Sequence, residues 1–187
     1  MVYEKEQLKN ELSSLHSYVR SRNIRKLREL NNTFTHNLLI YQDKLYLDLA
    51  VLSILLAKLI EKPRFWKFEK WKEVLFGIED TILQCLPLCD VYDKKGIQRN
   101  LKKILSVITI VDEQDRRYVD SLIDQAKVKI GSSLYAQGMS IGKASFLSEV
   151  SKEKIMSYSG KTLISDRFGK TYSIKERINN VRGVFGD

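Results

Sequence analysis

Apolar residues recur along most of the chain at intervals of three and four, which is the period of one face of a helix. The first stripe predicts a helix from about Val2 to about Leu30, with a kink near Ser21–Asn23. The residues of this stripe step by four, three and four, and they are Leu8, Leu12, Leu15 and Val19.

Polar residues that can cap a helix occupy positions 31–35, and they predict that a second helix runs from about Asn37 to Glu61. Pro63 should stop this helix, because proline lacks an amide hydrogen and clashes with the preceding turn. A third helix, rich in aromatic residues, should follow and end around Cys85–Pro87. Aromatic residues at helical spacing usually pack in a core, and a platform for an aromatic ligand is the alternative.

The next part of the chain predicts a loop over residues 87–96 and a fourth helix over about Ile97–Val107. A fifth helix should open at Asp112 and continue to about Tyr135. Gly138 follows as a stop signal, since glycine favours the left-handed conformation that ends helices.

Residues 135–160 have the layout of a helix-turn-helix: a helix that ends near a glycine, a short helix, a tight turn and a second short helix. We expect a support helix over Ile141–Ser148, capped by Ser140, and a recognition helix over Lys152–Ser159, capped by Ser151. A short second helix of this kind can enter the major groove of duplex DNA. Two short helices that pack on the bundle and bind nothing are the alternative. The expected inward positions are Ala144, Leu147, Val150, Ile155 and Tyr158, and the outward ones are Lys152, Glu153, Lys154 and Ser157.

This stretch, YAQGMSIGKASFLSEVSKEKIMSYSG, resembles the small prokaryotic helix-turn-helix family of the UPF0175 type, which is archaeal and cyanobacterial in the main and antitoxin-like. The matching residues are Gly138, Ser140, Gly142, Lys143, Ala144, Leu147, Val150 and Ser151. Two positions depart from the pattern: Ser145 replaces a small alanine, and Glu149 stands where the turn usually has glycine, a position that prefers φ > 0. The resemblance implies DNA binding and transcription regulation, with a PIN-domain toxin as the usual partner.

Beyond residue 160, a turn signal at 166–169 between strand-like ends indicates a small β-hairpin or an ordered loop. Ser173 and Glu176 form an S-x-x-E capping box that starts a last helix. Its apolar face consists of Ile174, Ile178, Val181 and Phe185. The sequence therefore predicts an all-α fold: a helical bundle in residues 1–111, and in residues 112–187 a long helix, a helix-turn-helix-like unit and a terminal helix.

The chain is basic, with 32 Lys and Arg against 23 Asp and Glu and a formal charge of +9. Such an excess favours a polyanionic partner, and solvated faces of a lysine-rich protein are the alternative. The candidate DNA-binding residues are Lys143, Lys152, Lys154, Ser157 and Lys161. A second basic patch consists of Arg20, Arg22, Arg25, Lys26 and Arg28. The predicted recognition face has no Arg, Asn or Gln to read base edges, which favours contact with the DNA backbone over base readout.

The sequence contains no phosphate-binding glycine loop, no H-E-x-x-H and no hydrolase nucleophile elbow. His16 and His36 have no acid or nucleophile near them in the sequence. With Cys85 and Cys89 they could supply four zinc ligands, but the missing C-x-x-C spacing argues against a metal site. We therefore expect no enzyme, no cofactor and no metal.

Two cysteines do not make a disulfide framework, which fits a reducing compartment. The charged N-terminus lacks the apolar core of a signal peptide, and the apolar stretch Leu49–Ala57 is too short to span a bilayer. We expect a cytoplasmic protein that does not enter a membrane. The first functional hypothesis is a DNA-associated, antitoxin-like regulator, and the alternative is a non-enzymatic adaptor whose C-terminal helical unit binds a partner protein.

Overall fold

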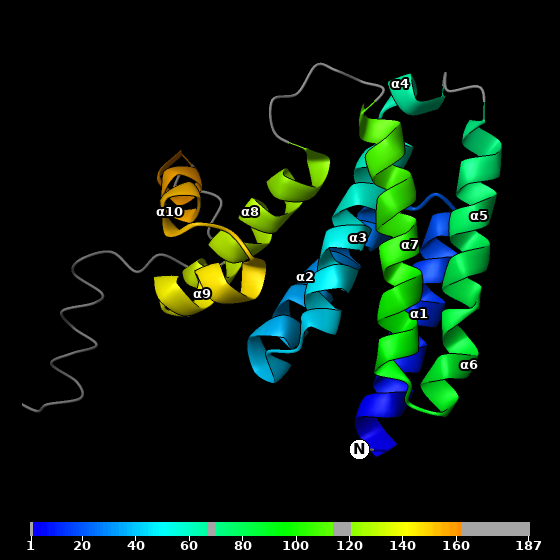
Figure 1. The fold of residues 1–187 in the computed structure, drawn as a ribbon, viewed down its shortest axis with the longest axis horizontal. Coiled ribbons are helices and arrows are strands. Elements are labelled where there is room, and N and C mark those ends of the chain that lie inside the picture. The colour runs from blue at the N-terminus through cyan, green and yellow to red at the C-terminus, as the bar shows by residue number, and fades with distance from the viewer. Residues whose placement is uncertain (1, 67–69, 114–120, 162–187) are drawn as a thin grey trace, which may run out of the picture.

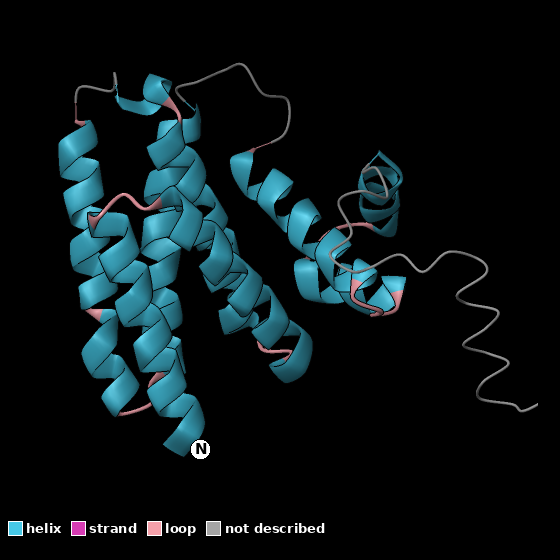
Figure 2. Cartoon of the chain, turned by 180° about the vertical axis from the view of Figure 1, so that it is seen from behind, coloured by secondary structure: helices cyan, strands magenta, loops and turns pink. Residues whose placement is uncertain are grey.

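The computed structural model describes residues 2–66, 70–113 and 121–161, and within these ranges every regular element is a helix (Figure 2). The all-α prediction is therefore confirmed. The predicted hairpin near residues 166–169 and the predicted last helix from Ser173 lie outside the described residues. The helices, labelled in Figure 1, are α1 Val2–Arg20, α2 Ile24–Tyr41, α3 Lys44–Glu61, α4 Pro63–Trp66, α5 Trp71–Leu83, α6 Cys85–Asp90, α7 Lys94–Glu113, α8 Leu122–Ala136, α9 Ile141–Ser148 and α10 Lys152–Lys161.

Helix α3 is the centre of the bundle, and almost all of its side chains are buried. It packs against α2, α7 and α8, while α1 lies against α2, α5 and α6. The predicted stripe of α1 is buried in the same core. The apolar run Leu49–Ala57 is thus a core helix, because it has neighbours on every side. None of the described helices combines the length and the apolar character needed to cross a membrane.

The first helix ends ten residues earlier than predicted, and a second helix begins at once. Arg22 adopts a left-handed conformation with φ 52°, and the Asn23 side chain accepts a hydrogen bond from the amide of Lys26 to cap α2. The polar stretch 31–35 is therefore the middle of α2 and not a helix start. Asn31 is buried there and donates a hydrogen bond to the carbonyl of Ala50 on α3 at 2.9 Å.

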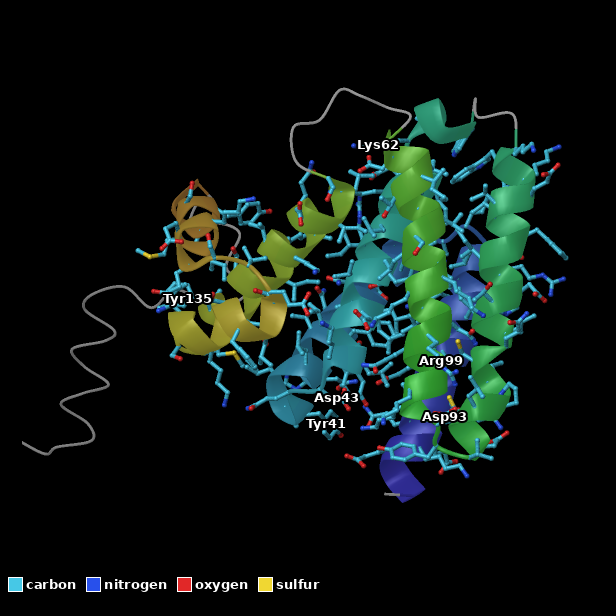
Figure 3. All side chains as sticks on the ribbon, in the orientation of Figure 1. Tyr41, Asp43, Lys62, Asp93, Arg99 and Tyr135 are labelled. Atoms are coloured by element: carbon cyan, nitrogen blue, oxygen red, sulfur yellow. The ribbon has the colours of Figure 1, made fainter. Side chains whose placement is uncertain are left out.

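The turn between α2 and α3 lies at Gln42–Asp43, so the predicted start at Asn37 is wrong. Gln42 has φ 53°, and the Asp43 carboxylate accepts a hydrogen bond from the amide of Leu45 at 2.9 Å. Asp43 lies at this corner, and Lys62 lies at the far end of α3, as Figure 3 shows. The predicted stop before Pro63 is confirmed, because α3 ends at Glu61.

The predicted loop over residues 87–96 is wrong, because α6 continues to Asp90 and α7 already begins at Lys94. Pro87 fits α6 because it lies in the first turn, where helical amides have no intrahelical partner. Helix α7 extends to Glu113, so Asp112 does not open the next helix. Ser121 caps α8 instead, and the Asp112 carboxylate accepts a hydrogen bond from the amide of Leu122 at 2.8 Å.

Helices α8, α9 and α10 form a three-helix unit at one side of the bundle. Helix α8 packs on α2 and α3, and α9 and α10 pack on α8. Figures 1 and 2 both place α10 at the end of the molecule that is remote from α5. This arrangement leaves the outer side of α10 away from the bundle core.

Candidate nucleic-acid interface on α9 and α10

The two short helices predicted for residues 141–159 are present, α9 with the predicted bounds and α10 two residues longer. Helix α8 ends just before Gly138. This glycine has φ 97°, the positive φ that the predicted helix stop requires. Ser140 caps α9 by accepting from the amide of Lys143 at 3.4 Å, and Ser151 accepts from the amide of Lys154 at 3.3 Å. The local sequence therefore places the start of each helix through its cap.

The turn between α9 and α10 depends on Glu149, whose φ of 57° and ψ of 37° are left-handed. This is the conformation that the family pattern, with glycine at the position, implies there. The hydroxyl of Ser145 donates to the carbonyl of Val150 at 2.6 Å, and the amide of Val150 donates back to the carbonyl of Ser145 at 3.2 Å. These bonds close the turn and fix the direction in which α10 leaves α9.

The Glu149 carboxylate also joins the turn to two other helices. Its two oxygens form ion pairs with Lys44 at the start of α3 and with Lys127 of α8, the latter at 2.6 Å. Hydrogen bonds from Lys127 and Lys44 lower the pKa of Glu149. A non-glycine residue in this conformation costs roughly 1 kcal/mol, which these contacts help to offset. No local signal reveals these partners, because Lys44 is 105 residues away in the sequence.

The inner side of the unit is closely packed around Gly131 of α8. A methyl group at Gly131 would lie 2.5 Å from the Ser148 hydroxyl and 2.9 Å from the Ile155 side chain. Ala144 and Ile155 are buried as predicted. Tyr158 was expected to face inward but is 37% exposed, because on α10 the residue that fills the space beside α8 is Ile155.

The exposed surface of the unit carries the predicted basic residues. Exposed side chains there include Lys143, Lys152, Lys154 and Ser157, and also Glu153. Lys161 is the last residue of α10, and its side chain is not described. Within the described residues, the salt bridges of this unit are formed by Glu149, and neither Lys143 nor Lys152 takes part in them. Two apolar side chains on the same helices are also exposed, Phe146 at 78% and Met156 at 60%. The sequence pattern did not indicate this exposure.

Tyr135, near the end of α8, is a further exposed aromatic residue of the unit and lies at its outer edge in Figure 3. The α8–α10 unit therefore presents lysines together with large apolar side chains. This mixture suits either a nucleic acid backbone or a protein surface, because both have charged groups beside apolar ones.

The alternative basic patch, Arg20 to Arg28, lies at the corner between α1 and α2, and all five cations are exposed. Three of them are in ion pairs with acids: Arg25 and Lys26 contact Glu29, and Arg28 contacts both oxygens of Glu61 at 2.7 Å. Hydrogen bonds from Lys26 and Arg25 lower the pKa of Glu29. These carboxylates compensate part of the positive charge of the patch, whereas Arg20 and Arg22 have no ion pair with an acid in the part of the chain that the structure describes.

The alternative zinc set of Cys85, Cys89, His16 and His36 does not form a cluster. No group of three or more His, Cys, Asp or Glu within the described ranges could hold a metal ion. Both cysteines are free and buried in α6. Burial raises the pKa of each thiol to about 11, which keeps the thiols protonated and weakly reactive at neutral pH.

A buried carboxylate on the central helix was not singled out from the sequence. Asp48 is 7% exposed, and its Oδ2 has no hydrogen-bond partner. Burial raises the pKa of Asp48 to about 6, although Lys44, Lys102 and Lys127 act in the opposite direction. The signal that could have found it is a lone acidic residue inside the apolar run LYLDLAVL.

Comparisons of the chain with protein-family models, with curated proteins and with solved structures found no match. The resemblance of residues 135–160 to the UPF0175 type therefore remains a prediction from those residues.

Proposed function

We propose that this protein is a DNA-associated, antitoxin-like regulator that contacts the backbone of duplex DNA with α9 and α10. The observation that carries the proposal is the placement of α10: it follows a three-residue turn, packs on α8 and α9, and keeps its basic first turn exposed. A short helix presented in this way has the arrangement with which helix-turn-helix proteins enter the major groove.

The charge at the start of α10 favours phosphate as the group contacted. Lys152 and Lys154 lie in the first turn, where the free amides and the helix dipole also attract anions. Lys143 lies in the first turn of α9, which would cross the DNA backbone. The exposed residues of α10 include Met156 and Ser157 but no Arg, Asn or Gln, so we infer that backbone contacts exceed base-specific ones.

The experiment is a salt titration of duplex DNA binding with two matched triple variants. Lys143→Ala, Lys152→Ala and Lys154→Ala together should weaken binding and reduce the salt slope by up to about three units, since each phosphate contact contributes roughly 0.9. The control removes the same charge from exposed lysines of the bundle, namely Lys72, Lys95 and Lys102. An equal loss in both variants would move the contact away from α9 and α10, and a parent protein that does not bind duplex DNA at low salt would refute the proposal.

A second candidate function is a protein-interaction adaptor, and the exposed side chains of Phe146 and Met156 favour it. Large apolar residues at a surface are typical of the centre of a protein interface. A PIN-domain nuclease is the partner that the sequence resemblance implies. Phe146→Ser with Met156→Ser should abolish co-purification of a protein partner from the native host. Loss of DNA binding without loss of the partner would reject the adaptor.

A further inference from the structure

An apolar groove lies between α5 and α7, on a part of the bundle that the proposed function does not use. Its volume is about 410 Å³. Ile78 and Ile104 form the floor and are buried, while Val107 and Ile110 of α7 form one wall and are 37% and 58% exposed. The groove is therefore an apolar surface that no described residue covers.

The groove exists because α5 has small residues where it faces α7. Its wall contains Val74, Gly77 and Thr81, which are spaced by three and four residues along one side of the helix. A methyl group built at Gly77 would have no atom within 4 Å. A side chain or a helix can therefore approach the α5 backbone closely at this point.

The segment from Ser173 to Phe185 has the properties of an occupant for this groove. Its capping box and its stripe of Ile174, Ile178 and Val181 predict an amphipathic helix, which lies outside the described residues. A helix this short is marginal by itself in water, so it needs an apolar surface to pack on. A second hollow, between α1 and α2, is lined mainly by polar residues of α1 and does not suit an apolar stripe.

The dimensions of the segment and of the groove agree. The stripe from Ile174 to Phe185 would extend over about 17 Å at 1.5 Å per residue. The α5 wall runs from Lys70 to Thr81 and covers about the same length, roughly 17 Å. The charged residues at the rim of the groove are Lys70, Glu73 and Lys103, and the segment carries Lys175, Glu176, Arg177 and Arg182, so the apolar stripe and not the charge is what fits the groove.

The chain is long enough for the segment to reach the groove of the same molecule. Helix α10 packs on α8, α8 contacts α7, and α7 packs on α5, so the route crosses three helix-to-helix steps of about 9 Å, or about 27 Å. Residues 162–172 can extend over about 36 Å. A tethered segment has an effective concentration in the millimolar range, which favours the same chain over a second copy.

We propose that residues 173–185 dock as a helix in the α5–α7 groove of the same chain. The docked helix buries its apolar stripe against Ile78, Ile104 and Val107, and Gly77 gives it room. Docking returns the C-terminus from the α8–α10 unit to the bundle, and it covers the exposed wall of α7.

Limited trypsin digestion of the full chain tests the docking. The digestion is stopped when most molecules have been cut only once, and the mass of the large fragment identifies the site of the cut. Docking protects Lys175, Arg177 and Arg182 but leaves Arg167 and Lys170 of the linker open, so the linker sites serve as an internal control. We expect cleavage in the segment to be at least about tenfold slower than cleavage in the linker, as local opening must precede it. Equal rates in the parent protein overturn the proposal.

Three variants test the groove and the segment separately. Gly77→Leu fills the open space at the groove, and Ile178→Asp disrupts the apolar stripe, so each should abolish the protection. Lys72→Leu adds the same side chain to an exposed position of α5 outside the groove and should keep the protection. Circular dichroism checks that each variant is folded, and Val107→Ser replaces Gly77→Leu if the latter loses helix content.

Two outcomes of these digestions would overturn the proposal. Protection that survives Gly77→Leu and Val107→Ser would show that another surface holds the segment. Protection that increases with protein concentration would show that a second copy supplies the segment, whereas protection independent of concentration supports docking within one chain.

Discussion

Asp48 allows the sharpest test of the packing of the central helix, through the replacement Asp48→Asn. The carboxylate is buried on α3, and burial raises its pKa from the ordinary 3.8 to about 6. The folded protein therefore binds this proton more tightly than the unfolded chain does. Between pH about 4 and about 6 the free energy of unfolding should fall as the pH rises, and this contribution should be constant above that window.

The size of the effect follows from the shift. Two pKa units at about 1.36 kcal/mol each make ionised Asp48 cost up to about 3 kcal/mol of stability at pH 7. Asparagine cannot ionise, so the variant lacks this pH dependence. The stability of Asp48→Asn minus that of the parent should therefore be higher at pH 7 than at pH 4 by up to about 3 kcal/mol. Taking the difference between two pH values removes the constant effect of placing an amide in the core.

The assay is urea denaturation followed by circular dichroism at pH 4 and at pH 7. Asp80→Asn is the matched control, because Asp80 is an exposed aspartate on α5 and the change in charge is the same. Its stability difference from the parent should be nearly independent of pH in comparison. If Asp48→Asn and the parent differ by the same amount at both pH values, the buried carboxylate does not carry the raised pKa and the reasoning is refuted.

Three further predictions concern packing, the turn and the thiols. Gly131→Val should cost about 1–3 kcal/mol, since there is no room beside α9 and α10, whereas Gly160→Ala should be neutral or stabilising; urea denaturation of both checks this. Glu149→Gly should be more stable than Glu149→Ala by roughly 1 kcal/mol, because both lose the ion pairs but only alanine keeps the left-handed strain; equal melting temperatures would contradict it. Cys85 and Cys89 should react with a thiol reagent much more slowly in the folded protein than in urea, and equal rates would show that these cysteines are accessible.

Local signals in the sequence account for the α9–α10 site in large part. Capping residues such as Ser140 and Ser151 act on amides three residues away, so the starts of both helices could be predicted. Gly138 likewise indicated a left-handed residue at the end of α8, and the family pattern implied one at position 149; both residues have positive φ. The exposure of Lys152 followed from the helical period alone.

The partners of this site could not be read in the same way. Glu149 meets Lys44 and Lys127 because α3 and α8 are packed beside the turn, and that neighbourhood exists only in the folded chain. Phe146 and Met156 are exposed although their residue types favour burial, and only the placement of α9 and α10 at the edge of the molecule decides this.

The sequence by itself determined that the chain is helical, because the period of apolar residues and the proline at 63 act over one or two helical turns. The tertiary structure decided that the kink predicted near Ser21–Asn23 is a full break, and where the later helices end. The chain turns at Arg22, Gln42 and Tyr92, which adopt left-handed conformations. None of these residues is a glycine, so the sequence does not indicate the left-handed conformation. Such conformations cost free energy locally, and they persist because the helices on either side bury their apolar faces against α3 and its neighbours.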